Sequence, residues 1–179
     1  NVANVLASGS LSVKDIVAPS FIEVDFTHIK IDEKYYRTLF VVGYPRYVSS
    51  NWLYSLVTFE HPLFISMFIY PSESKEVLEE LKRKIGEMEA TIENDMKGGK
   101  AVDPTVQVAL DDALSLQAEL AKGAERFFQF GLYITIPADT LYELNQISKQ
   151  VESILSSLLI ISKTATLQME EGFKSTLPM

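Results

Sequence analysis

Cysteine is absent from this chain of 179 residues, tryptophan occurs once and histidine twice. Without cysteine the sequence offers no disulfide, no thiolate zinc site and no cysteine nucleophile. The two histidines, His28 and His61, stand alone, because neither has a second histidine or a carboxylate at a ligand spacing such as H-E-x-x-H. We interpret both as ordinary surface or strand-end histidines, and we expect no metal site.

Positive charge and long apolar runs are also scarce. Lys and Arg number 16 against 24 Asp and Glu, a formal net charge of −8, which disfavours non-specific phosphate binding over most of the surface. The longest mostly apolar runs, 63–70 and 154–161, are far shorter than the ~20 residues that span a bilayer. No basic segment precedes an apolar one as in a secretory signal. Any membrane contact is therefore expected to be peripheral.

The composition itself is that of a folded protein, with 47% hydrophobic and 22% charged residues. Residues 1–20 are small, mixed and unpatterned, and we interpret them as a leading segment. The chain opens with Asn1, so processing or excision at its front is expected. Residues 21–179 are expected to form a single domain of ordinary size.

The first half of this domain is expected to contain three strands and a short helix. Residues 21–32 alternate apolar and polar side chains, which indicates an edge strand. Residues 35–44 are β-branched and aromatic and form a second expected strand. Residues 63–70 are nearly all apolar, so we predict a strand buried on both faces. Between these two strands, Ser49 or Ser50 is expected to cap the short helix. Its apolar face would hold Trp52, Leu53, Leu56 and Val57.

A helical hairpin is predicted over residues 73–124. In 73–97 apolar residues recur every three or four positions, and a Gly-Gly turn follows. Asp103 and Pro104 then give a cap and a proline at the first helical position. Because the connection is short, the two helices must run antiparallel.

The second half repeats the order strand, helix, strand. The clearest alternation lies in residues 126–136, and a helix follows in which Thr140 and Glu143 stand in capping-box register. A last strand over 160–168 leads into a short helix at 168–174. The fold class predicted is α+β, a ferredoxin-like split βαβ sandwich with helices on one face of an antiparallel sheet. The hairpin 73–124 would be inserted between its two halves.

No catalytic constellation is visible. Gly99-Lys100 invites comparison with a phosphate loop, but the positions for its first glycine and its final Ser or Thr hold Asn94 and Ala101. Adjacent carboxylates such as Glu79 and Glu80 point about a hundred degrees apart on a helix, so they do not converge as an acid–base pair. We expect no enzyme activity and no cofactor in these residues.

Candidate contact residues are of the types enriched at binding surfaces. Trp52 either contacts a partner or fills the core beneath the short helix, and Arg46 and Tyr47 either contact a partner or serve locally. Tyr133 lies on the more polar face of its strand with Gln129 and Thr135, a face that we expect another part of a larger protein or a neighbouring subunit to cover. The full set of candidates is Arg46, Tyr47, Trp52, Met88, Met96 and Tyr133.

The order of these segments is similar to a known family. Tyr44-Pro45-Arg46 ends a strand, Trp52-Leu53 opens a helix, and an apolar strand and a long helix pair follow. Over roughly residues 30–178 the chain resembles the N-terminal domain of the TraC-, TrbE- and CagE-type ATPases of type IV secretion systems. The C-terminal QMEEGFKSTLP, with Gly172-Phe173 and Leu177-Pro178, resembles the segment where that domain meets the motor domain.

The resemblance implies a domain separated from its motor, which would follow downstream and would hold ATP and magnesium. The implied role is non-catalytic assembly and docking of a conjugation or secretion ATPase. The partners implied are its own motor domain, further copies of the ATPase in a homo-oligomer, and inner-membrane secretion subunits, without direct contact to nucleic acid. The implied location is bacterial and cytoplasmic, or peripheral at the inner face of the cell membrane.

An alternative interpretation is a free-standing ferredoxin-like domain that binds single-stranded nucleic acid, because such sheets can stack exposed aromatics on bases. Residues 37–44 do not fit the pattern of RNA-binding strands, and the net charge has the wrong sign. Salt-dependent oligonucleotide binding would favour this alternative, and a downstream phosphate loop would favour the ATPase interpretation.

Overall fold

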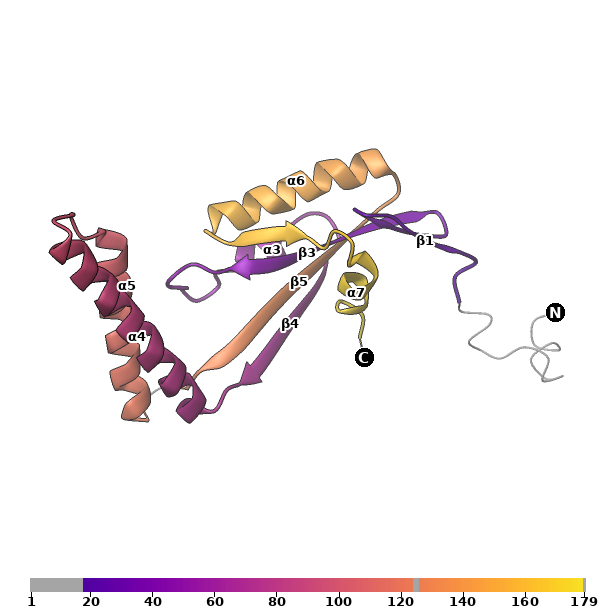
Figure 1. The fold of residues 1–179 in the computed structure, drawn as a ribbon. Helices are drawn as coiled ribbons and strands as arrows, with labels where there is room; N and C mark the ends of the chain where they lie inside the picture. The colour runs from indigo at the N-terminus through magenta and orange to yellow at the C-terminus, as the bar shows by residue number, and fades with distance from the viewer. Residues whose placement is uncertain (1–17, 124–125, 179) are drawn as a thin grey trace, which may run out of the picture. The chain divides into compact units, whose positions relative to one another are not determined.

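The computed structural model describes residues 18–123 and 126–178, so most of the expected leading segment 1–20 lies outside the described residues (Figure 1). The described chain forms two compact units. Unit 1 comprises residues up to Met67 together with Gly131 onward, and unit 2 comprises Phe68–Phe130. Each is described by itself. The predicted class α+β is confirmed, because helices combine with a sheet whose recorded pairings are antiparallel.

The segment expected to be one edge strand, 21–32, is a hairpin of two short strands. β1 (Ile22–Val24) pairs antiparallel with β2 (Ile29–Ile31). The chain reverses between them, where the Asp25 N–H donates to the His28 carbonyl at 2.9 Å and the Asp25 side chain accepts from the Thr27 N–H at 3.3 Å. Asp and Thr favour such turns by bonding to nearby backbone. The prediction of a single strand was therefore wrong.

The centre of the sheet is β3 (Lys34–Gly43), which pairs with three strands. On one edge it pairs with β5 (Phe128–Ala138). On the other edge its first residues pair with β2 and its last residues with β6 (Ile161–Thr164). The edge strand beyond β5 is β4 (Phe64–Pro71).

One face of the sheet in unit 1 is covered by α6 (Leu141–Ser157), which packs over β3 and β6 (Figure 1). The predicted cap is confirmed, since the Thr140 hydroxyl accepts from the Glu143 N–H at 3.1 Å. The Glu143 carboxylate in turn accepts from the Asp139 N–H at 3.0 Å. The core on this face is mainly aliphatic. Its buried members include Leu39, Ile134, Ile136, Leu144, Val151 and Leu155.

The opposite face is covered by the short C-terminal helix α7 (Met169–Lys174) and the residues that follow it. Three buried hydroxyls meet there. Thr38 and Thr135 are 2.6 Å apart, and Thr176 donates to Thr135 at 2.8 Å. Helices therefore lie on both faces rather than on one. Thr135, which was expected to be covered by another part of a larger protein or a neighbouring subunit, is covered by Thr176 of this chain.

Close approach of α7 to the sheet depends on Gly172. A Cβ on this residue would lie 3.0 Å from the Ala165 Cβ and 3.1 Å from the Thr38 Cγ2. Met169, also buried, places its sulfur 3.2 Å from the Thr38 N–H, which donates to it. This bond falls in the gap between the parts of β3 that pair with β2 and with β6.

The helix predicted after the second strand is shorter than expected. It is α3 (Tyr54–Val57), its N-cap residue is Leu53, and no side chain caps it, so the predicted caps at Ser49 and Ser50 are wrong. Trp52 and Leu53 precede the helix rather than lie on its face. The chain turns at Asn51, whose φ of 63° is a conformation that Asn tolerates better than most residues.

The prediction that the 63–70 strand is buried on both faces is also wrong. Met67 is 56% exposed and Ile69 is 60% exposed. The cause is position, because β4 lies at the edge of the sheet and has β5 as its neighbour on one side. Apolar content alone does not reveal whether neighbouring elements exist.

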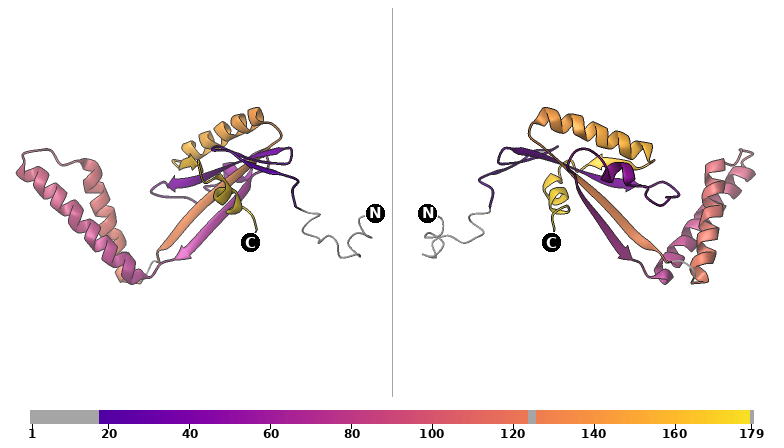
Figure 2. Two further views of the ribbon diagram at one scale, coloured as in Figure 1. Left: turned by 45° about the vertical axis from the view of Figure 1, so that its right-hand side comes forward. Right: turned by 180° about the vertical axis from the view of Figure 1, so that it is seen from behind.

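Unit 2 contains two long helices, α4 (Ser74–Lys97) and α5 (Pro104–Ala121), which pack along each other as a hairpin (Figure 2). The predicted start of α5 is confirmed, with Asp103 accepting from the Thr105 N–H at 2.8 Å. The buried contacts between the helices are made by Ile85, Ile92, Leu110 and Ala113. None of the helices in residues 18–123 and 126–178 is long and apolar enough to cross a membrane.

Candidate interaction surfaces

The histidines of the described ranges serve local structure. The His61 ring Nε2 lies 2.6 Å from the Pro137 carbonyl, within hydrogen-bond distance, and so ties the segment after α3 to β5. The His28 ring lies 3.6 Å from the Asp25 carboxylate in the β1–β2 turn. Within the described residues, no cluster of three or more His, Asp or Glu side chains could hold a metal ion.

The guanidinium of Arg37 is half-buried in unit 1. Its Nε donates to the Thr27 carbonyl at 2.9 Å, and one terminal nitrogen donates to the Ser148 hydroxyl at 3.3 Å. Burial lowers the pKa of Arg37, and the nearby Glu152 carboxylate opposes that shift. These contacts fix the β1–β2 turn against α6, which is a structural role.

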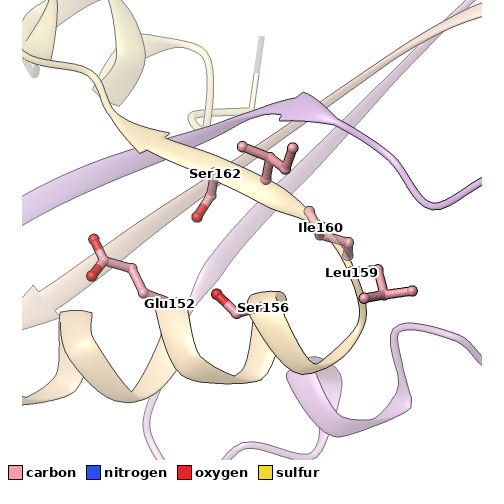
Figure 3. A pocket seen from close by; sticks show the side chains of 6 residues that line it. Glu152, Ser156, Leu159, Ile160 and Ser162 are labelled. Carbon is pink, nitrogen blue, oxygen red and sulfur yellow. The ribbon is translucent and has the colours of Figure 1, made fainter. Parts of the chain in front are cut away.

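A hollow opens between the end of α6 and β6, lined by polar groups (Figure 3). The Glu152 carboxylate and the hydroxyls of Ser156 and Ser162 lie around it, with Leu159 and Ile160 at one end. No histidine, lysine or second carboxylate is among its lining residues. Glu152 is the one ionisable side chain among these lining residues, so the hollow holds no set of nucleophile, base and orienting group.

A second hollow lies between α3 and β4 within unit 1, and we call it the α3–β4 groove. It has a volume of about 570 Å³. Val57 at its rim is 70% exposed and Met67 is 56% exposed, whereas Leu56 at its base is 1% exposed. The complete lining is Leu53, Leu56, Val57, Phe59, Glu60, His61, Pro62, Leu63, Ile65 and Met67.

The stretch that forms this groove is poor in charge. Between Arg46 and Glu73 the sequence holds one charged residue, Glu60, in a chain of which 22% is charged. Soluble surfaces normally mix charges of both signs, and contiguous apolar surface marks interaction sites. Several apolar side chains of this stretch are nevertheless exposed, in the groove and outside it. They include Tyr47, Val48, Tyr54, Val57, Phe64 and Met67.

A neighbouring hollow between α3 and α6 shares the Phe59–His61 wall with the groove. Its lining adds the Glu143 carboxylate to that of Glu60 and contains no Lys or Arg. The two hollows together present apolar surface with negative charge at its border. Exposed apolar surface of this kind is typical of sites that contact other macromolecules.

The residues proposed from sequence are dispersed. Tyr47 is 79% exposed, and the Arg46 guanidinium lies 5.5 Å from the centre of its ring. Trp52 is half-buried beside the start of the groove. Tyr133 is half-buried on the α7 face, with its ring centre 6.5 Å from that of Phe40. These four belong to unit 1.

The other two candidates belong to unit 2. Met88 packs against the core of the helical hairpin, and Met96 near the end of α4 is 63% exposed. Sequence reasoning missed most residues of the α3–β4 groove. The signal that could have found them is the near absence of charge over residues 47–72.

A scan against family models matched residues 20–179 to one family, described as the CagE, TrbE, VirB family, component of type IV transporter system. The chain belongs to this family. The resemblance inferred from the order of segments is thereby confirmed, and the match begins about ten residues earlier than the resemblance did. A search of curated proteins found no match. A CagE, TrbE, VirB family member is thus a component of a transporter apparatus, which agrees with a surface suited to macromolecular contact.

Proposed function

We propose that this chain is the non-catalytic N-terminal assembly and docking domain of a type IV secretion ATPase. The observation that carries the proposal is the family match over nearly the whole chain. The exposed apolar surface around α3 and β4 supports it, because such a surface in a component of a multi-protein apparatus is best explained by contact with other subunits.

We also propose that the sheet of unit 1 is ferredoxin-like. Along β6, β3, β5 and β4 the strands neighbour one another in the order expected for a ferredoxin-like sheet, with antiparallel pairing recorded for β6–β3 and β3–β5. The β1–β2 hairpin is an addition that occupies the part of the β3 edge left free by β6.

The helical hairpin, taken as an insertion over 73–124, is proposed to be an assembly arm. Its two helices bury a seam between them, yet apolar side chains remain outside that seam. Val108 and Leu114 on α5 are 45% and 41% exposed, and Met96 on α4 is more exposed still. Exposed Met and aliphatic side chains on a helix fit contact with a partner helix.

The proposed partners are the motor domain of the same ATPase, further copies of it in a homo-oligomer, and inner-membrane secretion subunits. ATP and magnesium would bind the motor domain and not this one. The proposed location is the cytoplasm, or the inner face of the cell membrane as a peripheral protein. Transfer of DNA by conjugation is the form of transport that we propose.

The arm is tested by replacing residues 73–124 with a short Gly/Asn turn. We expect the shortened chain to stay folded, because unit 1 keeps its own core, and to lose association with the other subunits of the apparatus. Circular dichroism and Trp52 fluorescence report folding, and copurification with the secretion subunits reports association. Unfolding of the shortened chain would place the hairpin in the core, and unchanged association would refute the arm.

A matched pair of point variants distinguishes loss of an exposed apolar contact from a general effect of adding Asp to α5. Leu114→Asp changes an exposed apolar residue of α5, and Ser115→Asp makes the same replacement at the next position, which is also exposed. We expect weaker copurification for the first variant and wild-type behaviour for the second.

A further inference from the structure

The α3–β4 groove marks a place where the layer of helices over the sheet is incomplete. On this face α6 lies over β3 and β6, and α3 contacts α6. Since α3 is a single turn of four residues, it leaves much of β4 uncovered. Ile65 and Met67 alternate along the strand, and both line the groove together with Leu63 just before it, so they share the helix-bearing face.

The opposite face of β4 is occupied within unit 1. Phe64 points away from Ile65, and its ring stacks on Tyr36 with 6.4 Å between centres. Tyr36 in turn meets Phe173 of α7 at 5.2 Å. Within unit 1 the more exposed apolar side chain of β4, Met67 at 56%, lies on the side of α3 and α6, next to the 70%-exposed Val57, whereas Phe64 on the other side is 40% exposed. A helix laid beside α3 would complete the layer.

The charged residues around the groove indicate which charge a bound helix would carry. Glu60 lines both hollows and Glu143 lines one of them, while no Lys or Arg lines either. A second copy of the same groove would bring carboxylates together, which is unfavourable. A helix with an apolar face and basic residues at its border would bury Val57 and Met67 and neutralise Glu60.

We propose that the α3–β4 groove binds an amphipathic helix of a partner protein, with apolar residues seated between α3 and β4 and Lys or Arg beside Glu60. This inference rests on the proposed docking function and gives it a site and a partner chemistry. Trp52, the sole tryptophan, directly precedes the first lining residue Leu53 and so provides a fluorescent reporter at the groove.

The test uses designed peptides without tryptophan and the 179-residue chain. One peptide of about 18 residues, or five helical turns, carries Leu on one face and Lys on the other. A second replaces every Lys with Glu, and a third scrambles the order of Leu and Lys. Titrations follow Trp52 emission. We expect binding of the Leu/Lys helix and not of the other two.

Variants locate the binding on the molecule. Val57→Asp and Glu60→Lys should each weaken binding of the Leu/Lys helix by about tenfold. Val48→Asp and Glu33→Lys are the matched controls, since Val48 is 55% exposed and Glu33 is exposed, and neither lines the groove. The controls should bind as the wild type does. Urea unfolding of each variant checks that the fold is retained.

Three results would overturn the inference: equal binding by all variants, equal binding of the Leu/Glu helix, or no binding of any peptide up to roughly 1 mM, the weak limit of specific association. Its failure is distinguishable from failure of the docking function. If the wild-type chain copurifies with secretion subunits and Val57→Asp does so equally well, the groove is excluded while the function stands. If the wild-type chain copurifies with none, the function itself fails.

Discussion

The hydroxyl cluster beneath α7 allows a quantitative test of how the C-terminal segment is held. Thr38 and Thr135 are 0% exposed and Thr176 is 8% exposed. Thr135 is the middle member, 2.6 Å from Thr38 and 2.8 Å from Thr176. The Thr176 hydroxyl also lies 2.8 Å from the Phe173 carbonyl. Replacing Thr135 with valine keeps the shape and removes the central hydroxyl.

The expected cost of Thr135→Val is about 2 kcal/mol, because the buried Thr38 hydroxyl loses this partner where water does not reach it. Once Thr135 is replaced, Thr176 donates to the Phe173 carbonyl instead, 2.8 Å away. The double variant Thr38→Val with Thr135→Val removes both ends of the broken bond. Replacing both partners by apolar groups of the same shape is nearly neutral, so the double variant should regain most of the lost stability.

The assay is urea unfolding followed by Trp52 fluorescence, which reports unit 1 because Trp52 belongs to it. A loss of about 2 kcal/mol should also lower Tm by roughly 6 °C in a domain of this size. Thr166→Val, at an exposed position, is the control and should leave stability unchanged. The reasoning is refuted if Thr135→Val unfolds like the wild type, or if the double variant is no more stable than the single one.

Three further predictions concern the glycines, a cap and nucleotide binding. Gly86→Ala should stabilise α4 by about 0.5–1 kcal/mol, because an added Cβ meets nothing within 4 Å. Gly172→Val should destabilise unit 1 by about 1–3 kcal/mol through overpacking. Thermal melts by circular dichroism measure both changes, and a lower Tm for the first variant or a higher Tm for the second would contradict the prediction. Hydrogen bonds from the Thr105 backbone and side chain lower the pKa of Asp103 below its ordinary value of 3.8. The cap therefore contributes fully above that value and is lost as pH falls through the lower folded pKa. NMR titration of the Asp103 carboxyl should give a midpoint below 3.8, and Asp103→Asn should remove this part of the acid sensitivity of unit 2. Calorimetric titration of the chain with Mg-ATP should show no site of micromolar affinity; such a site would contradict the assignment of nucleotide binding to the motor domain.

Elements with strong local signals were predictable from sequence. The start of α5 follows from Asp103 and Pro104, and the start of α6 from Thr140 with Glu143. In each case the side chain that the pattern selected makes the capping bond. Caps act within one helical turn, so the residues that decide them are adjacent in the sequence.

Features that depend on distant neighbours were not predictable. The alternation in 21–32 continues through the turn, so it resembles one strand although the chain reverses at Asp25. Apolar content predicted a buried β4, but its burial depends on α3, which ends after a single turn. The side of the sheet on which α7 lies is decided by contacts between residues far apart in the sequence. Gly172 lies against Thr38, and Thr176 bonds to Thr135.

The α3–β4 groove was likewise only partly predictable from sequence. Trp52 was selected as a residue type and lies beside the groove, but Val57 and Met67 are ordinary apolar residues until the structure shows them exposed. A helix and a strand that each have an apolar face are normally expected to cover each other. Here they leave a hollow, and only the three-dimensional arrangement reveals it.

The pairing of β3 has a consequence for synthesis of the protein. Two of its partners come late in the chain, since Leu39 pairs with Ile134 on one edge and with Thr164 on the other. The sheet of unit 1 therefore cannot close until the last part of the domain has left the ribosome, and β3 waits with open edges during translation. The contacts between α4 and α5 are local, so unit 2 can form while unit 1 is still incomplete. A nascent chain halted before β6 should consequently depend on chaperones, and one extended past Thr176 should not.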